Sequence, residues 1–424
     1  MISSKTRHVK VRLQQFISPT VVTLGRGFAA VTAGSLLGRL LNAIAGLLLV
    51  RYFNGPALYG QYAILVTTLA LISTVLGLGL DTWLLREGGR DPTQLAFNAR
   101  RLLMFKLITA SFLISVLVLA WNHTGLNWIL IVGMLGVIAE SYIRTGHVIL
   151  HALNRNTLVA ILQSVDSFFA VVLILILMIW PPQIAFVVVG QSVVSGITLA
   201  IVAILLAEYW RGTWRPLHLP RLIRNTSFFV LADVLANIYS QAQIAILALF
   251  TNDLIVGTFR SANNLITISF LVPMAMFNVG LPVLSRPNLE RRHRHYLLAG
   301  MVSVSVLYGI VVLGVFWQFG SHILRIVYGN NYEATIRLLT PLSVIPLFKS
   351  LSFVAVAIML SLGKQRLRVF IQSIVVMLSL LGGFIFIPRL GLDGATLTYI
   401  LVEGLLCILY WTGAIYTLRK TNSL

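Results

Sequence analysis

Polar side chains that could bind a charged molecule recur on single faces of otherwise apolar segments. The two clearest faces carry Arg39 and Asn42 in the first apolar segment, and Asp233, Asn237 and Gln241 in a segment near the middle of the chain. A charge inside hydrocarbon is costly, so it usually faces a cavity or a partner. Either the two faces line one cavity, or Arg39 and Asp233 form a structural pair that joins two parts of the fold.

Two further segments carry candidates for the same cavity. Arg260 and Asn264 are spaced four residues apart and therefore share a helical face. Lys349 follows Pro341 and Pro346 within one apolar segment. Prolines can kink a helix, and a kink is also a place at which a helix can bend. We expect these cations and amides to bind a substrate.

The remaining buried charges have simpler explanations as well. Glu140 and Arg144 either form a local ion pair, for which they have the i, i+4 spacing, or face the cavity, where they could couple an ion. Asp166 and Glu403 are either structural residues with satisfied hydrogen bonds or sites of ion coupling. His147 and His151 have no third ligand beside them except Glu140, so no metal site is expected. The sequence has no Walker A loop, and no cofactor is expected.

These residues must be positioned by membrane-spanning helices. The chain has 424 residues, of which 58% are hydrophobic and 10% charged, with a mean hydropathy of +0.90. The apolar residues form blocks of about 20, the length that crosses a bilayer as a helix. A transmembrane barrel would alternate over about 10 residues instead. We predict an all-α polytopic membrane protein with about 12 spans, at 28–50, 60–84, 102–121, 128–150, 158–180, 184–207, 226–250, 256–281, 297–317, 335–360, 369–387 and 394–417.

The basic residues set the predicted orientation. Most of the 32 Lys and Arg residues fall in the N-terminal segment, in alternate loops and at the C-terminus, and we place these parts in the cytoplasm of a bacterium. Both termini would then lie on the cytoplasmic side of the inner membrane. This bias also explains the net charge of +20, so no nucleic-acid partner is expected. Residues 1–27 form a basic amphipathic arm that would rest on membrane lipids.

The chain divides into two halves that resemble each other. A linker at 208–225 separates a first six-helix bundle at 28–207 from a second at 226–417, and 418–424 form a cytoplasmic tail. Phe53, Gly60 and Tyr62 are repeated 197 residues later as Phe250, Gly257 and Phe259. Because six spans separate the copies, the halves share one orientation, and we expect a central cavity between two pseudo-symmetric bundles.

Five segments resemble, in order, landmarks of a known family. They are VRYFNGPALYGQYAI (50–64), LGLGLDTWLLRE (76–87), VGTFRSANNLITISFLVPMAMFNVGLPVLSR (256–286), YGNNYEAT (328–335) and IPRLGLDGAT (387–396). The chain resembles the polysaccharide biosynthesis flippases, Wzx-like O-antigen flippases within the multidrug/oligosaccharidyl-lipid/polysaccharide exporter superfamily.

This resemblance implies a function that is not enzymatic. It implies alternating access of a central cavity and translocation of an oligosaccharide linked to undecaprenyl pyrophosphate, from the cytoplasmic to the periplasmic leaflet. A polysaccharide polymerase and chain-length machinery would be further partners. Family members of this kind have basic cavities, and Arg39, Arg260 and Lys349 match that property by their positions within spans.

Two other functions compete with this reading. A multidrug exporter of the same superfamily would bind organic cations in an acidic, aromatic site, and the count of buried charges does not exclude it. A membrane-embedded polysaccharide polymerase or ligase would need a large extracytoplasmic loop. Every such loop in this chain is short.

Overall fold

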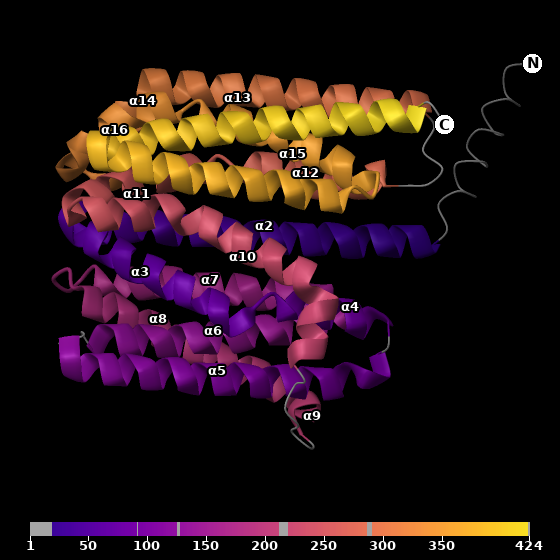
Figure 1. Cartoon of the computed structure of the whole chain (residues 1–424), viewed down its shortest axis with the longest axis horizontal. Helices are drawn as coiled ribbons and strands as arrows, with labels where there is room; N and C mark the ends of the chain where they lie inside the picture. The colour runs from indigo at the N-terminus through magenta and orange to yellow at the C-terminus, as the bar shows by residue number, and fades with distance from the viewer. Residues whose placement is uncertain (1–18, 91, 125–127, 212–218, 286–290, 423–424) are drawn as a thin grey trace, which may run out of the picture.

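The computed structural model describes residues 19–90, 92–124, 128–211, 219–285 and 291–422. These residues form helices and turns without a strand, which confirms the all-α prediction. The long helices run roughly alongside one another (Figure 1). Their bounds are α2 Pro19–Phe53, α3 Pro56–Gly77, α4 Leu80–Arg90, α5 Leu95–Thr124, α6 Trp128–Ala152, α7 Asn156–Leu177, α8 Ile184–Leu205, α9 Ala207–Trp210, α10 Leu219–Phe250, α11 Asp253–Ile268, α12 Leu271–Leu284, α13 Arg291–Tyr328, α14 Glu333–Leu342, α15 Ile345–Ser361 and α16 Gln365–Asn422, with short 3-10 turns η1 Pro92–Gln94 and η2 Asn330–Tyr332.

The described helices account for the predicted spans. Eight helices are long and apolar enough to cross a membrane, or ten if each of two bent pairs counts as one span. The helix α16 contains two antiparallel arms that meet at Gly391 (Figure 1). Counting these arms separately, and adding the shorter apolar segment Val234–Phe250 of α10, gives the expected twelve.

Proline explains where the two bent pairs break. A proline inside a helix has no N–H with which to donate a hydrogen bond to the carbonyl four residues earlier, and the proline ring clashes with that carbonyl. Pro273 lies four residues after Ser269, where α11 ends and the chain bends by 42° into α12. Pro346 lies four residues after Leu342, where α14 ends and the chain bends by 47° into α15.

Left-handed backbone residues make two other sharp turns. Leu78 and Gly79 have φ of 40° and 63°, so the predicted span at 60–84 ends early at Gly77 and a separate helix, α4, follows. Gly391 has φ of 55° and separates the arms of α16. Glycine occupies this region without the steric cost that a side chain would add.

The helices fall into two halves, α2–α8 and α10–α16. The helix α10 begins at Leu219, inside the predicted linker, and residues 212–218 lie outside the described chain. Residues 1–18, most of the predicted amphipathic arm, also lie outside it, and α2 begins at Pro19 rather than at 28. Leu84, Leu95 and Val202 belong to a core cluster of the first half, whereas Val354 and Tyr410 belong to one of the second.

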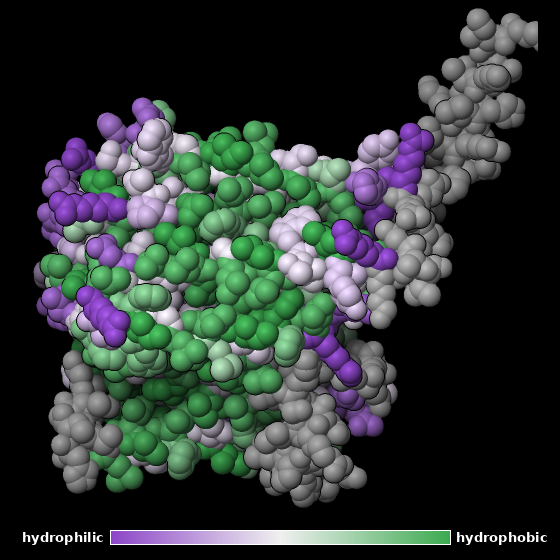
Figure 2. Space-filling model, turned by 45° about the horizontal axis from the view of Figure 1, so that its top comes forward, coloured by the Kyte–Doolittle hydropathy of each residue, from purple (hydrophilic) through white to green (hydrophobic). Residues whose placement is uncertain are grey.

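The outer surface fits a bilayer. Figure 2 shows a broad hydrophobic band across the middle of the visible face, with hydrophilic residues gathered toward its two ends. Large apolar side chains such as Phe112, Ile204 and Trp317 are 66%, 76% and 69% exposed. In water this exposure would be unfavourable, but it is what lipid-facing residues require.

Candidate substrate-binding cavity

A cavity of about 380 Å³ lies between the two halves, against α2 on one side and α11 and α12 on the other. Arg39, Asn42 and Asn264, which the sequence placed on separate polar faces, line it together. Thr267 adds a hydroxyl, and Phe270 adds an aromatic ring. The full lining is Arg39, Asn42, Ala43, Gly46, Leu47, Asn264, Thr267, Ile268, Phe270, Leu271 and Met274.

Arg39 gives the cavity an exposed cation. Its guanidinium touches the Met274 sulfur, a weak acceptor that cannot neutralise the charge. No described carboxylate pairs with it. The side chain of Asp233, the partner considered from the sequence, lies outside the described residues. Asn42, one turn along α2, is also exposed, so both side chains are available to a ligand.

Asn264 connects the cavity to the contact between the halves. Its Nδ2 donates to the Tyr59 hydroxyl over 2.8 Å. Arg260, one turn earlier on α11, does not line the cavity. It is half-buried beside the same Tyr59 hydroxyl. The predicted polar face of α11 therefore has one member inside the cavity and one beyond it.

The predicted face of α10 lies elsewhere. Gln241 accepts a hydrogen bond from Thr67 of α3 over 3.4 Å, so it joins the two halves. The Asn237 carbonyl accepts from Ser240 over 2.8 Å. Neither Asn237 nor Gln241 lines the cavity described above.

Lys349 and Glu403 form an ion pair inside the second half. The Lys349 Nζ lies 2.6 Å from Glu403 Oε1, and the two side chains are 19% and 0% exposed. Tyr239 donates to the same carboxylate over 2.7 Å. The ammonium also lies 5.9 Å from the Phe270 ring centroid, so it sits behind a wall of the cavity. Lys349 was proposed for the substrate and Glu403 for structure or coupling, but their pairing was not foreseen.

The acidic residues Asp166 and Glu140 of the first half form no ion pair with a described residue. Asp166 accepts from Thr198 over 2.8 Å, which joins α7 to α8. Glu140 and Arg144 are both exposed, and these two described residues form no ion pair with each other despite their spacing. Within the described chain, no group of three His, Cys, Asp or Glu could hold a metal ion.

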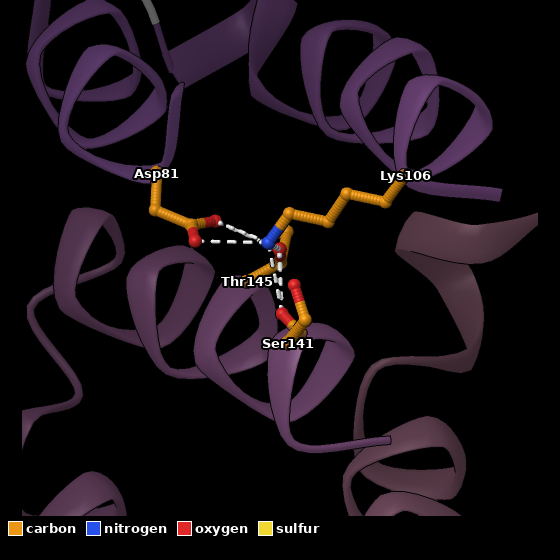
Figure 3. Close-up of polar contacts among 4 residues, drawn as sticks. All are labelled: Asp81, Lys106, Ser141 and Thr145. Carbon is orange, nitrogen blue, oxygen red and sulfur yellow. Dashed lines mark hydrogen bonds and ion pairs between the residues drawn. The ribbon is translucent and has the colours of Figure 1, made fainter. Parts of the chain in front are cut away.

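Sequence reasoning missed a buried cluster in the first half. Lys106, near the start of the predicted span 102–121, is 0% exposed, and its Nζ lies 2.8 Å from Asp81 Oδ2. Its ammonium also donates to the Ser141 carbonyl and the Thr145 hydroxyl, over 2.9 and 2.8 Å (Figure 3). Thr145 in turn donates to Asp81 over 2.8 Å. The cluster joins α4, α5 and α6, and the only sequence signal was the opposite charge of two residues in neighbouring spans.

The halves are closed against each other at the Phe53 end of α2. We call this contact the seam: the turn from α2 to α3 and the first turns of α3, packed against the start of α11 and η2. Asn331 donates to the Asn54 carbonyl over 2.8 Å, and Tyr332 donates to the Val50 carbonyl over 2.8 Å. Tyr59 is 2% exposed within it. The cavity therefore ends at the seam.

Comparison with known proteins now assigns the family. Residues 24–287 match the family of polysaccharide biosynthesis proteins. The chain belongs to this family. The match confirms the resemblance read from the ordered motifs. No curated protein sequence matches the chain.

Solved structures share the fold at low identity. A lipid II flippase, MurJ, in an inward closed conformation superposes with a TM-score of 0.77 at 12% identity, covering 90% of this chain and 87% of that one. An inward-facing multidrug resistance MATE transporter gives 0.65 at 15%, covering 90% and 96%. A transporter from Pyrococcus furiosus, described as having a binding pocket of reversed polarity, gives 0.62 at 16%, covering 92% and 94%. All three structures share the fold of this chain.

Proposed function

We propose that this protein is a flippase for a lipid-linked oligosaccharide carried on a pyrophosphate of the undecaprenyl type. It would take the substrate from the cytoplasmic leaflet and release it in the periplasmic leaflet by alternating access. The observation that carries the proposal is Arg39, an exposed guanidinium in a cavity between the halves, without a carboxylate partner among the described residues. The family membership supports the same conclusion.

The chemistry of the cavity suits a pyrophosphate and a sugar. Burying an unpaired charge in hydrocarbon is strongly unfavourable, so a flippase must replace the water around the phosphate. One cation 4 Å from an anion contributes about 4 kcal/mol at an effective dielectric of about 20, before desolvation is subtracted. The fork of Arg39 can bind a phosphate through two hydrogen bonds. The amides of Asn42 and Asn264 can bind hydroxyl groups, while the lipid tail stays in the bilayer.

The location and partners follow from this function. The protein would span the bacterial inner membrane with both termini in the cytoplasm. Polysaccharide polymerase and chain-length machinery would receive the translocated glycan. Membrane lipids would surround the apolar band that Figure 2 shows.

Charge exchange between Arg39 and Asp233 tests the proposal. If Arg39 binds phosphate, Arg39→Asp with Asp233→Arg should express normally but fail to export glycan, because the cation has moved to another helix. Arg39→Lys should remain partly active, because it keeps the charge and loses the fork. Full export by a well-expressed Arg39→Ala variant would contradict the proposal. Efflux of organic cations by a protein that does not export glycan would favour the multidrug alternative.

A further inference from the structure

A second guanidinium without a carboxylate partner lies beyond the cavity. Arg260 is half-buried, and no described carboxylate pairs with it. Its surroundings are tyrosines: it lies beside the Tyr59 hydroxyl and close to Tyr62 and Tyr399. Phenol groups solvate a cation only in part, so a partly buried guanidinium here is costly unless an anion joins it at another stage.

Arg39 and Arg260 stand at different depths along one path. Gly46 of α2 is level with Asn264 of α11, since a Cβ on Gly46 would lie 3.9 Å from the Asn264 Nδ2. Arg39 is seven residues before Gly46, or about 10 Å along the helix. The helix α11 begins at the seam, so Arg260, one turn before Asn264, lies about 6 Å nearer to the seam than Asn264 does. Arg39 lies on the other side of this level, farther from the seam. The backbone positions of Arg39 and Arg260 are therefore about 16 Å apart along the helix axis.

The tyrosine and amide between them close the path. Tyr59 belongs to the first half, and Asn264 and Arg260 belong to the second, so their contact exists only while the seam is closed. Asn264 donates to Tyr59 over 2.8 Å at the inner end of the cavity. An anion on Arg39 would reach Arg260 only after Tyr59 had moved away.

We propose that Arg260 is a second, later anion-binding station, closed off by Tyr59 and Asn264 in this state and opened when the halves part at the seam. This inference rests on the proposed function. Arg39, on the first half, receives the phosphate group of the substrate from its own side of the membrane. Separation of the seam uncovers Arg260, on the second half, to the opposite side. The phosphate passes from one guanidinium to the other, so a counter-charge is present at both ends of the passage.

Thiol labelling tests the opposite exposure of the two stations. Cys407 is buried and is the one cysteine of the sequence, so Cys407→Ala gives a cysteine-free background. Arg39→Cys and Arg260→Cys, each made in it, are labelled with a membrane-impermeant reagent in inside-out and right-side-out vesicles. We expect the two cysteines to react from opposite faces. Adding Tyr59→Phe, which keeps the ring and loses the Asn264 contact, should speed the reaction of Arg260→Cys. Labelling of both cysteines from one face at similar rates would overturn the proposal.

Binding and flipping of undecaprenyl pyrophosphate, measured separately in proteoliposomes, test the order of the stations. Arg39→Gln should weaken binding about tenfold or more, the effect of losing one charge-assisted hydrogen bond. Arg260→Gln should bind like the wild type and flip about tenfold more slowly or worse. Arg389→Gln, which changes an exposed cation outside the cavity lining, is the matched control. Equal loss of binding in Arg39→Gln and Arg260→Gln would show one site and overturn the proposal. Absence of binding by the wild type would instead contradict the proposed function, and the labelling would still decide the exposure of the two positions.

Discussion

Gly60 of α3 and Gly257 of α11 meet across the seam in a reciprocal contact. A Cβ on Gly60 would overlap the Asp253 carbonyl oxygen and lie 2.9 Å from the Gly257 nitrogen. A Cβ on Gly257 would overlap the Pro56 carbonyl oxygen and lie 2.8 Å from the Gly60 nitrogen. The two backbones are in direct contact, and only glycine permits this approach. In the repeat that the sequence predicts, each residue is the equivalent of the other.

We predict that Gly60→Ala or Gly257→Ala prevents closure of the seam. The added methyl group meets rigid backbone, so α3 and α11 must separate, and the state described here becomes inaccessible. Asn54→Cys and Asn331→Cys, in the Cys407→Ala background, should crosslink readily because Asn331 contacts Asn54 in the closed seam. Either alanine should abolish that crosslink and strongly reduce glycan export.

Gly196→Ala is the control for these glycine substitutions. Gly196 lies in α8, and a Cβ there would meet nothing within 4 Å. This variant should crosslink and export like the wild type. Normal crosslinking in Gly60→Ala would mean that the helices tolerate the methyl group, and the account of the seam would be wrong.

The internal repeat was visible in the sequence, but its role was not. The offset pattern of Phe53, Gly60 and Phe250, Gly257 indicated two similar halves. That the two glycines touch each other is visible only in the packing of α3 against α11. Periodicity gave the spans and the polar faces, because 20-residue apolar blocks and i, i+4 spacing are local signals.

Pairings between distant helices could not be predicted in the same way. Lys349 and Glu403 were each recognised as buried charges, but no local pattern connects α15 with the second arm of α16. Lys106 lies near the start of its predicted span, and no local pattern in the sequence indicates that it is buried. Only the packing of α4, α5 and α6 shows that it is enclosed.

Lys106→Met should destabilise the protein. The substitution leaves Asp81 without its ammonium, and breaking a buried pair from one side costs about 3–5 kcal/mol. The additional change Asp81→Asn should recover much of the loss, because the unpaired carboxylate is gone and Thr145 can still donate to the amide oxygen. Thermal unfolding in detergent measures both. Lys364→Met, at an exposed position, should change stability by no more than about 0.5 kcal/mol. A Lys106→Met variant as stable as the control would contradict this reading of the cluster.

The orientation of the chain makes a separate prediction. Reporter fusions at Leu424 should give a cytoplasmic signal, since the basic residues concentrate at the termini and in alternate loops. A fusion in the turn between α2 and α3, at Gly55, should give a periplasmic signal. A periplasmic signal at Leu424 would contradict the predicted orientation, and together with a periplasmic signal at Gly55 it would also contradict the twelve-span count.

The Lys349–Glu403 pair distinguishes a structural cation from one that binds substrate. Lys349→Met alone should lower stability and export, because it leaves the fully buried Glu403 without its counter-ion. In the double variant Lys349→Met with Glu403→Gln, no charge remains, and Tyr239 can still donate to the amide oxygen. We expect the double variant to recover both stability and export, because the ammonium is already neutralised and lies behind Phe270 rather than in the cavity lining. Unfolding temperature and glycan export are measured on the wild type, the two single variants and the double variant. Together they separate a structural role of Lys349 from a role in substrate binding. A double variant that is as stable as the wild type but does not export would show that Lys349 acts on the substrate, as its position in the sequence first indicated.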